Sequence, residues 1–369
     1  MYIKLLLWLT GCLLAMGFLP IASEKSYDLL SYKDSAGKNH RIKSKKEWLA
    51  RRKQILENLQ LGMGSLPVSK RNEPVEAVFR DSLVTDRYTR YTLQLAVAEN
   101  ENVPAYYYVP KAAEKPFAAM LALHPTGELG KDITDGKSPR ANRAYAKELA
   151  ERGYAVLAPD FPGYGALRDY DFASDRYESG AVKGVFNHIR CVDFLQSRSE
   201  INPDAIGVIG HSLGGYNAIF LGAFDTRLKI VVASSGWTLF DFYKPWSEEA
   251  VKRHGGRLGP WAQEVNMPPL RHRYHLDGSL FPFDFHEAVA AIAPRTFFSN
   301  SPLEDYFSAE GVKTGMKPIQ EVYRLMGAVN NVHAEYPSGG HDFPTAQRKA
   351  AYHLIDTRLN HQPLDHMIE

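Results

Sequence analysis

Cysteine is scarce in this sequence, since its 369 residues include two, Cys12 and Cys191. So few thiols exclude a disulfide framework, which a chain of this length does not need in order to fold. The sequence has no CxxC pair and no cluster of histidine with cysteine, so a structural metal site is not expected. Cys191 falls within an expected helix, where we interpret it as a small buried hydrophobic side chain.

Net charge is also low, at +2 for the whole chain at pH 7. This balance gives no argument for nucleic acid or for an anionic membrane surface as a partner. The hydrophobic share of 44% and the charged share of 23% are those of an ordinary globular protein. The length allows one large α/β domain with additions, or two modest domains.

A long apolar run occurs at the very beginning of the chain. Lys4 supplies a positive charge, residues 5–20 are apolar, and Ile21-Ala22-Ser23 offers a cleavage site. Residues 1–23 are therefore predicted to be a signal peptide, and the protein is expected to be exported to the periplasm or secreted. Two alternatives stay open: an uncleaved signal anchor, and a lipoprotein whose Cys12 carries the lipid.

Residues 24–75 are predicted to form an N-terminal helical extension. Between residues 44 and 63, the apolar side chains of Trp48, Ile55 and Leu59 recur among many charged residues. This spacing is typical of an amphipathic helix, which we expect to pack on the outside of the main domain.

Beyond residue 75, the periodicity predicts antiparallel strands followed by a mostly parallel sheet. Residues 76–85, 87–97 and 103–109 alternate apolar and polar residues, as strands with one wet face do. Strands and helices then alternate, which indicates a doubly wound α/β domain over residues 76–369. The expected strands are 117–123, 155–158, 205–209, 229–233, 295–298 and 332–336, and the expected helices are 138–152, 180–197, 216–224, 317–326 and 344–359.

Residues 237–292 interrupt this alternation and are rich in aromatic residues, arginine, histidine and proline. An insertion after a strand of a doubly wound sheet lies over the carboxyl edge of the sheet, where ligands bind. We therefore interpret residues 237–292 as a cap over a functional site. Its ring-bearing side chains include Trp237, Phe240, Phe242, Tyr243, Trp246, Trp261, Tyr274, Phe281, Phe283 and Phe285.

The pentapeptide Gly210-His211-Ser212-Leu213-Gly214 matches the pattern G-x-S-x-G. The pattern alone is a weak signal, but here an expected strand precedes it and an expected helix follows it. Such a sharp turn forces the serine into strained dihedrals and leaves no room for neighbouring Cβ atoms. Ser212 is therefore the candidate nucleophile, at a helix N-terminus that favours developing negative charge.

A serine hydroxyl needs a base, and the base needs an acid that holds its tautomer. His341 lies in a glycine-rich loop just after the last expected strand, which is the position expected for the base. The acid is expected after the strand at residues 295–298, where Glu304 and Asp305 are adjacent. Asp305 is favoured because its shorter side chain suits a loop that returns to His341. Asp342 and Asp241 are the remaining alternatives.

The oxyanion formed by nucleophilic attack needs two backbone N–H donors. One is expected from Leu213, the residue after the nucleophile. The other is expected from the loop after residues 117–123, which begins His124-Pro125-Thr126. Because Pro125 has no N–H, Thr126 is the first candidate donor, and a simple exit turn is the alternative interpretation of the loop.

With these residues in place, the sequence resembles the α/β-hydrolase superfamily. The likeness is strongest to secreted acetyl xylan esterases, dienelactone hydrolases and the catalytic domains of prolyl oligopeptidase-type enzymes. The segments that carry it are Leu123-His124-Pro125-Thr126, residues 160–165, residues 210–215, Ala293-Pro294-Arg295 leading to Asp305, and Gly340-His341-Asp342-Phe343-Pro344. They span residues 103–360 and are specific for the superfamily, but not for a substrate. His124-Pro125 departs from the usual His-Gly, and nothing ahead of the domain resembles a β-propeller.

The resemblance implies ester hydrolysis through an acyl-enzyme, with Ser212, His341 and Asp305 as the catalytic residues and no cofactor. An exported enzyme with an aromatic cap suggests a carbohydrate ester as substrate, because aromatic rings stack on sugar faces. The alternative is that these rings only pack the cap. Arg271-His272-Arg273 could bind an acidic sugar or could form a solvated turn.

Two other functional classes also stay open, a peptidase or amidase and a non-catalytic binding protein. The expected partner is a small-molecule or oligosaccharide ester, with no stable membrane contact unless Cys12 is lipidated.

Overall fold

The computed structural model describes residues 27–33, 36–67 and 75–365. The predicted signal peptide at residues 1–23 and the possible lipid site at Cys12 lie outside these residues. Within the described ranges, no helix combines the length and the apolar character needed to cross a bilayer.

A nine-stranded sheet runs through the molecule in the order β11-β10-β9-β8-β6-β7-β5-β4-β3. Its strands are β3 (Ala77–Val84), β4 (Tyr88–Ala98), β5 (Glu101–Pro110), β6 (Phe117–Leu123), β7 (Ala155–Pro159), β8 (Ile201–His211), β9 (Ile230–Ser234), β10 (Thr296–Asn300) and β11 (Val332–Glu335). The pairs β3–β4, β4–β5 and β5–β7 are antiparallel, and the other pairs are parallel. The predicted α/β class, with antiparallel N-terminal strands on a mostly parallel sheet, is confirmed.

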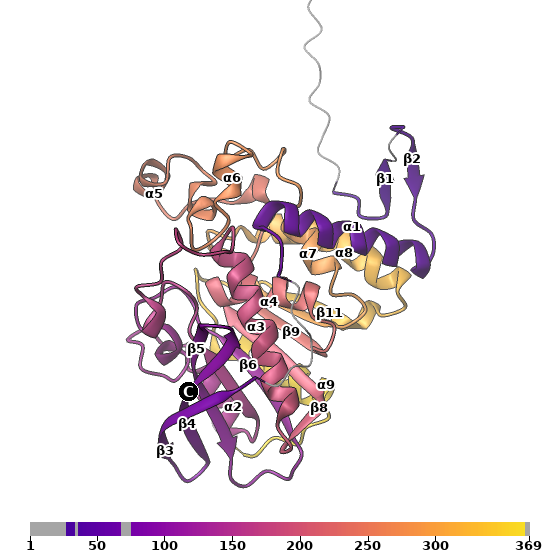
Figure 1. Cartoon of the computed structure of the whole chain (residues 1–369). Helices are drawn as coiled ribbons and strands as arrows, with labels where there is room; N and C mark the ends of the chain where they lie inside the picture. The colour runs from indigo at the N-terminus through magenta and orange to yellow at the C-terminus, as the bar shows by residue number, and fades with distance from the viewer. Residues whose placement is uncertain (1–26, 34–35, 68–74, 366–369) are drawn as a thin grey trace, which may run out of the picture.

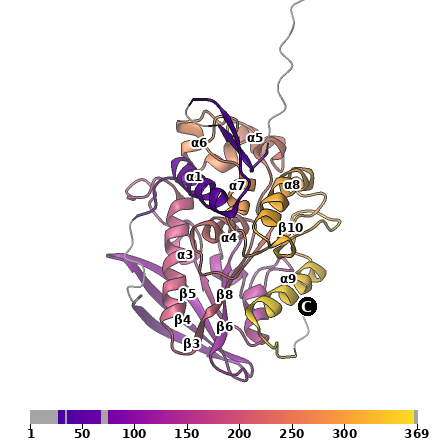
Figure 2. The same cartoon turned by 90° about the vertical axis from the view of Figure 1, so that its right-hand side faces the viewer.

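Helices cover both faces of the sheet, and each face has its own hydrophobic core. One face carries α3 (Gly180–Ser197), α4 (Leu213–Phe224) and α8 (Ala309–Leu325), whereas the other carries α2 (Tyr145–Glu151) and α9 (Thr345–Leu359). Figure 2 shows α3 and α9 on opposite sides of the sheet. The central strands β6, β7, β9 and β10 are buried along their whole length, as strands covered on both faces are.

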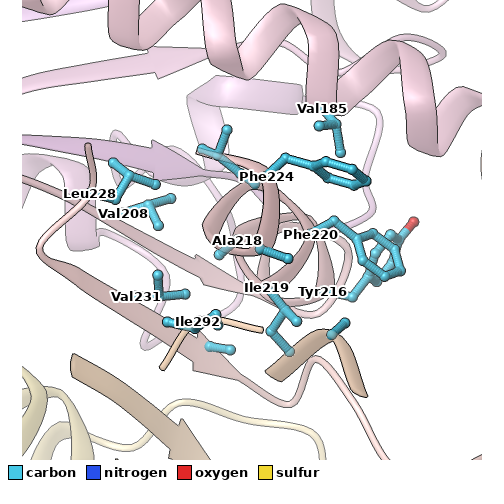
Figure 3. Packing of buried hydrophobic residues seen from close by; sticks show 14 of the residues in the cluster. Val185, Val208, Tyr216, Ala218, Ile219, Phe220, Phe224, Leu228, Val231 and Ile292 are labelled. Atoms are coloured by element: carbon cyan, nitrogen blue, oxygen red, sulfur yellow. The ribbon is translucent and has the colours of Figure 1, made fainter. Parts of the chain in front are cut away.

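Helix α4 is the centre of the larger core, and all twelve of its residues are buried. Ile219, Phe220 and Phe224 pack among side chains of α3, β8 and β9, such as Val185 and Val208 (Figure 3). The Phe220 ring also stacks on a ring of the cap segment at 5.6 Å. The helix that carries the candidate nucleophile at its start is therefore held on every side.

The N-terminal extension contains the expected helix α1 (Lys45–Met63), but also a two-stranded sheet of β1 (Ser31–Lys33) and β2 (Asn39–Arg41). The extension thus contains a short hairpin in addition to the expected helix. Ser44 caps α1, and the Glu47 side chain returns to the Ser44 backbone in a capping box. Arg52 donates hydrogen bonds to the carbonyls of Ala291 at 2.7 Å and Ala223 at 2.5 Å. The extension is thus fixed to the rest of the molecule beside α7 (Phe285–Ala290) (Figure 1).

Two helices begin far from their predicted starts. The helix expected at residues 138–152 begins only at Tyr145, because the preceding segment contains Pro139 and turns at Asn142, whose φ is 62°. The helix expected at residues 317–326 begins eight residues earlier, at Ala309. Pro318, a residue that favours helix starts, lies inside this helix instead.

The segment 237–292 lies between β9 and β10 and forms short helices above one end of the sheet (Figure 1). They are η3 (Phe240–Phe242), α5 (Glu248–Arg253), η4 (Gly259–Ala262), α6 (Pro269–His272) and α7 (Phe285–Ala290). Many of its rings pack on one another, as in the contacts of Phe240 with Phe281 at 5.6 Å and of Trp261 with Phe285 at 4.8 Å. Most of the aromatic residues of the cap are therefore part of its own core.

Candidate active site

Ser212 stands alone between the end of β8 and the start of α4, with φ 56° and ψ −118°. A positive φ is strained for a residue with a side chain, and strain of this kind gathers at functional sites. The turn is held by hydrogen bonds from Ser212 N to Ser234 O at 2.8 Å and from Gly215 N to Ser212 O at 2.9 Å. The strand–turn–helix expected around Ser212 is thus the observed geometry.

The glycines on either side of Ser212 are required by close approach of the backbone. A Cβ on Gly210 would lie 2.2 Å from Gly214 O, and a Cβ on Gly214 would lie 2.0 Å from Leu123 O. Backbone atoms cannot move aside as a flexible side chain can. The mechanical reason given for the G-x-S-x-G pattern therefore applies at these two positions.

The structure brings Ser212, His341 and Asp305 together in one line of hydrogen bonds. His341 Nε2 lies 2.8 Å from Ser212 Oγ, and His341 Nδ1 lies 3.0 and 3.1 Å from the two oxygens of Asp305. The Asp305 carboxylate is fully buried, and it also accepts a bond from Phe307 N at 3.1 Å. A carboxylate beside Nδ1 keeps the proton on that nitrogen, so Nε2 is left to accept the serine proton.

The competing carboxylates are engaged elsewhere. Asp342 bonds to Arg143 and Asn142, and although burial opposes its charge, these bonds outweigh burial and lower the pKa of Asp342. Glu304 accepts a hydrogen bond from Gly339 N, and Asp241 accepts one from Tyr27 at 2.6 Å. Of the four candidates, Asp305 is the acid that contacts His341.

Backbone hydrogen bonds align the acid loop with the base loop. Strands β10 and β11 are parallel neighbours, so the loops that leave their carboxyl ends start side by side. Leu303 N donates to Pro337 O at 2.9 Å, and Glu304 N donates to Gly339 O at 3.0 Å. These bonds tie the two loops together just before Asp305 and His341.

The two expected oxyanion donors lie in the neighbourhood of Ser212. Leu213 N is the first backbone N–H of α4, and Thr126 lines the same cavities as Ser212. Across residues 27–33, 36–67 and 75–365, neither N–H donates a hydrogen bond within the protein. Both groups are therefore available to a ligand.

His124 fixes the loop that presents Thr126. Its Nδ1 lies 2.7 Å from Pro125 O, and its Nε2 accepts a hydrogen bond from Phe161 N at 3.0 Å. Burial lowers the pKa of His124, so the ring stays neutral and can donate from one nitrogen while it accepts at the other. The histidine of this loop therefore has a positioning role in the structure.

Sequence reasoning missed Tyr306 and His211 as neighbours of the base. The Tyr306 hydroxyl lies 2.8 Å from His341 Nε2, and its ring stacks on the imidazole at 4.3 Å. The His211 ring lies 4.8 Å from the His341 ring, and burial lowers the pKa of His211 well below its usual value, so it adds no charge there. Tyr306 directly follows the predicted acid Asp305, and this position is the one feature of the sequence that could have indicated a contact with His341. Nothing else in the sequence distinguishes Tyr306 from the other aromatic residues.

Two cavities meet at Ser212. The cavity on the side of the cap has a volume of about 310 Å³, and the cavity on the side of the Thr126 loop has a volume of about 540 Å³. We call them the cap pocket and the loop pocket. Their walls share Thr126, Ser212, Trp246 and Tyr306. Within the described part of the chain, no group of three or more His, Cys, Asp or Glu residues is arranged to hold a metal ion.

The doubly wound sheet, the strained serine at a strand–helix turn and the histidine after the last strand define an α/β hydrolase. The alpha/beta hydrolase family model matches residues 140–353, more than half of the chain, and the chain belongs to that family. The predicted superfamily, and with it the assignment as an enzyme of the hydrolase class, is confirmed.

Relatives of known name include several esterases. YtaP of Bacillus subtilis (strain 168), which is named as a hydrolase, is 29% identical over 266 residues, which make up 69% of this chain and 83% of YtaP. Carbohydrate esterase MZ0003, from an unknown prokaryotic organism, is 22% identical over 338 residues, or 78% of this chain and 76% of the esterase. Among solved structures, a glucuronoyl esterase from Solibacter usitatus matches with a TM-score of 0.68 at 17% identity, covering 90% of this chain and 97% of that one. At this identity the structural likeness establishes the fold alone.

Proposed function

We propose that this protein is a carboxylic ester hydrolase that works through an acyl-enzyme on Ser212. His341 is the general base and acid, and Asp305 orients it. The observation that carries the proposal is the hydrogen-bond line of Ser212 Oγ to His341 Nε2 at 2.8 Å and of His341 Nδ1 to Asp305 at 3.0 Å. These distances are within the range at which a proton passes between a nucleophile and its base.

The reaction takes place in two halves. Ser212 Oγ attacks the ester carbonyl carbon while its proton passes to His341 Nε2, and the resulting oxyanion accepts hydrogen bonds from the N–H groups of Leu213 and Thr126. The bond between the acyl carbon and the alcohol oxygen then breaks, and His341 returns the proton to that oxygen. In the second half, water gives a proton to His341 and attacks the acyl carbon. The bond from that carbon to Ser212 Oγ then breaks, His341 returns the proton to Oγ, and the acid is released. Asp305 stabilises the imidazolium each time it forms.

We propose a carbohydrate ester as the substrate class. Two matches support this choice, because one is named as a carbohydrate esterase and the other as a glucuronoyl esterase. Trp246 adds support, since it contributes to both pockets beside Ser212 and is 54% exposed, as an aromatic platform for a sugar would be. Export of the enzyme, through the segment at residues 1–23, is part of the same proposal.

The proposal is tested with Ser212→Ala and His341→Ala. Each variant is expected to lose hydrolysis of a short-chain nitrophenyl ester while its circular dichroism and melting temperature stay those of the wild type. A fluorophosphonate is expected to label Ser212, as read by peptide mass spectrometry, and to label the Ser174→Ala control equally well, because Ser174 is exposed and remote from the line of hydrogen bonds. Undiminished ester hydrolysis in either active-site variant would contradict the proposal, as would turnover of aminoacyl anilides with none of esters.

A further inference from the structure

The two pockets at Ser212 differ in whether they reach the proposed acid–base residue. His341 lines the loop pocket together with Arg140 and Ser138. For the residues that the structure describes, His341 takes no part in the walls of the cap pocket, whereas Leu213 does. Ser212 is common to both pockets, so an ester whose carbonyl carbon lies at Ser212 can bind in two orientations. Its acyl half occupies one pocket and its alcohol half occupies the other.

The proposed reaction is possible in only one of these two orientations of the ester. His341 must hand its proton to the oxygen of the departing alcohol, so that oxygen has to lie within hydrogen-bond reach of Nε2. The alcohol half of the ester therefore extends on the His341 side, into the loop pocket. The acyl half is bonded to the other side of the same carbon and extends away from His341, into the cap pocket.

Many of the residues that line the cap pocket are aromatic. Tyr216, Tyr243, Trp261 and Phe307 contribute rings to it, and each of these residues is less than 7% exposed. The rings brace one another, with centroids 5.1 Å apart for Tyr216 and Trp261 and 5.6 Å apart for both Tyr243 and Phe307 against Trp261. Such a wall offers ring edges and faces at fixed positions, which suits a flat apolar group.

Three polar side chains of this pocket are engaged with each other or with the backbone, while Arg253 and His254 line its outer part. The Tyr216 hydroxyl donates to the Asn266 side chain, and the Asn266 amide donates to Pro260 O at 2.9 Å. The Gln263 amide donates to the same carbonyl at 3.0 Å. Along the part of the wall formed by Tyr216, Gln263 and Asn266, an acyl group rich in hydroxyls would find few open partners, whereas a hydrocarbon ring needs none.

The volume of the cap pocket sets the size of the acyl group. A closed apolar cavity of about 150 Å³ binds benzene. The cap pocket, at about 310 Å³, is twice as large, so an acetyl group would leave most of it unfilled. A phenyl ring joined to the carboxyl by two carbons would fill it far better.

We propose that the cap pocket takes the acyl half of the substrate and that this half is an aryl-propanoid acyl group, while the loop pocket takes the alcohol. This inference rests on the proposed function and narrows it, from carbohydrate esters in general to esters of bulky aromatic acids. The exposed side chains of Glu128 and Arg140 in the loop pocket offer polar contacts to a hydroxyl-rich alcohol such as a sugar.

The test uses the full chain and three methyl esters, which share their alcohol and differ in their acid: methyl acetate, methyl 3-phenylpropanoate and methyl glucuronate. Their kcat/KM is measured by proton release. Burial of the phenyl ring is expected to give the phenylpropanoate at least about a tenfold advantage over the acetate. A larger kcat/KM for methyl acetate or methyl glucuronate would overturn the inference and leave the esterase proposal standing. If none of the three, and no nitrophenyl ester, is hydrolysed, the proposed function itself fails.

A pair of bulky substitutions then tests which pocket takes which half. Val265 is half-buried in the cap pocket, and Val265→Trp is expected to lower the ratio of kcat/KM for phenylpropanoate over acetate at least about tenfold, because it fills the space of the ring. Leu129 is exposed in the loop pocket, and Leu129→Trp is expected to leave that ratio within about twofold, since the methyl alcohol does not reach it.

The alcohol series gives the reverse pattern. Leu129→Trp is expected to lower the ratio for the 6-O-glucosyl ester over the methyl ester of 3-phenylpropanoate, whereas Val265→Trp is not. Exchange of the two patterns would overturn the assignment of the pockets. Val265→Phe replaces Val265→Trp if the larger side chain lowers the melting temperature.

Discussion

The turn at Ser212 and the cap at residues 237–292 are built in different ways. Around the turn, backbone lies on backbone, so that a Cβ on Gly214 would lie 2.0 Å from Leu123 O. In the cap, side-chain rings lie on rings, as Phe240 does on Phe281 and Phe285. Close contacts between backbone atoms are compatible with only one backbone conformation at the turn. Packed aromatic rings can be replaced by other sets of rings that fill the same space. The turn and its loops therefore determine the geometry of the proposed reaction, whereas the choice of substrate depends on the cap.

The largest effect on activity is expected from substitution of Asp305, the acid of the proposed reaction. Asp305→Asn leaves the shape of the loop but removes the charge that holds the His341 tautomer, so kcat is expected to fall about 10⁴-fold. The matched control is Asp342→Asn, which removes a neighbouring carboxylate that bonds to Arg143 and not to the His341 ring. Its kcat is expected to stay within about tenfold of the wild type, with any loss appearing in stability. Equal losses of kcat in the two variants would contradict the assignment of Asp305.

The next largest effect is expected in the backbone of the turn. Gly214→Ala drives a Cβ into Leu123 O and is expected to cost about 3 kcal/mol of unfolding free energy, measured by urea denaturation. Gly340→Ala is the control, because a Cβ there meets its nearest atom, Glu304 O, at 3.9 Å. It is expected to change the unfolding free energy by less than about 0.5 kcal/mol. If both variants unfold alike, close approach of the backbone is not what selects glycine at the turn.

Much of the fold on the turn side could be predicted because each signal there is local. The predicted strand 117–123 and the predicted helix 180–197 have the observed bounds of β6 and α3. Continuous apolar residues mark a strand that is buried on both faces, and Ser179 caps the helix where the pattern begins. The sequence predicts Ser212, His341 and Asp305 for the same reason. Their order in the chain and their positions after strands place them at the carboxyl edge of the sheet.

The remaining features depend on contacts between distant segments. Arg143 lies just before the helix that begins at Tyr145, and its guanidinium bonds to Asp342, which is 199 residues away. Tyr306 acquires its position from the ring of His341, and nothing in its own neighbourhood specifies that contact. The two pockets likewise arise only where the cap meets the loops. No local pattern encodes these features.

The cap is expected to unfold locally at a lower free energy than the sheet. Substitution of Arg257 tests this difference. Its guanidinium donates to the carbonyls of Phe240 and Tyr243, so it ties the middle of the cap to the start of the cap. Arg257→Met is expected to lower the opening free energy of the cap amides by about 2 kcal/mol, measured by native-state hydrogen exchange, without changing that of β6 or β9. Lys252→Met, at an exposed position of α5, is the control and is expected to change neither. Faster exchange in the sheet as well would mean that the cap and the sheet open as one unit.

The last effect concerns acid, which is expected to lower the unfolding free energy gradually through a buried histidine of α3. His188 on α3 lies 6.1 Å from the Phe161 ring, and burial lowers its pKa to about 3. The unfolded chain has an ordinary histidine pKa of about 6.5 and binds the proton first, so stability falls as the pH drops from about 6.5 towards 3. One proton contributes a slope of up to about 1.4 kcal/mol per pH unit. His188→Leu is therefore expected to flatten the pH dependence of the unfolding free energy by up to that slope, whereas His353→Leu, at an exposed position of α9, is not. If the pH dependence of the unfolding free energy is the same in His188→Leu as in the wild type, the imidazole of His188 takes up its proton in the folded state. Burial of α3 would then not keep this histidine neutral.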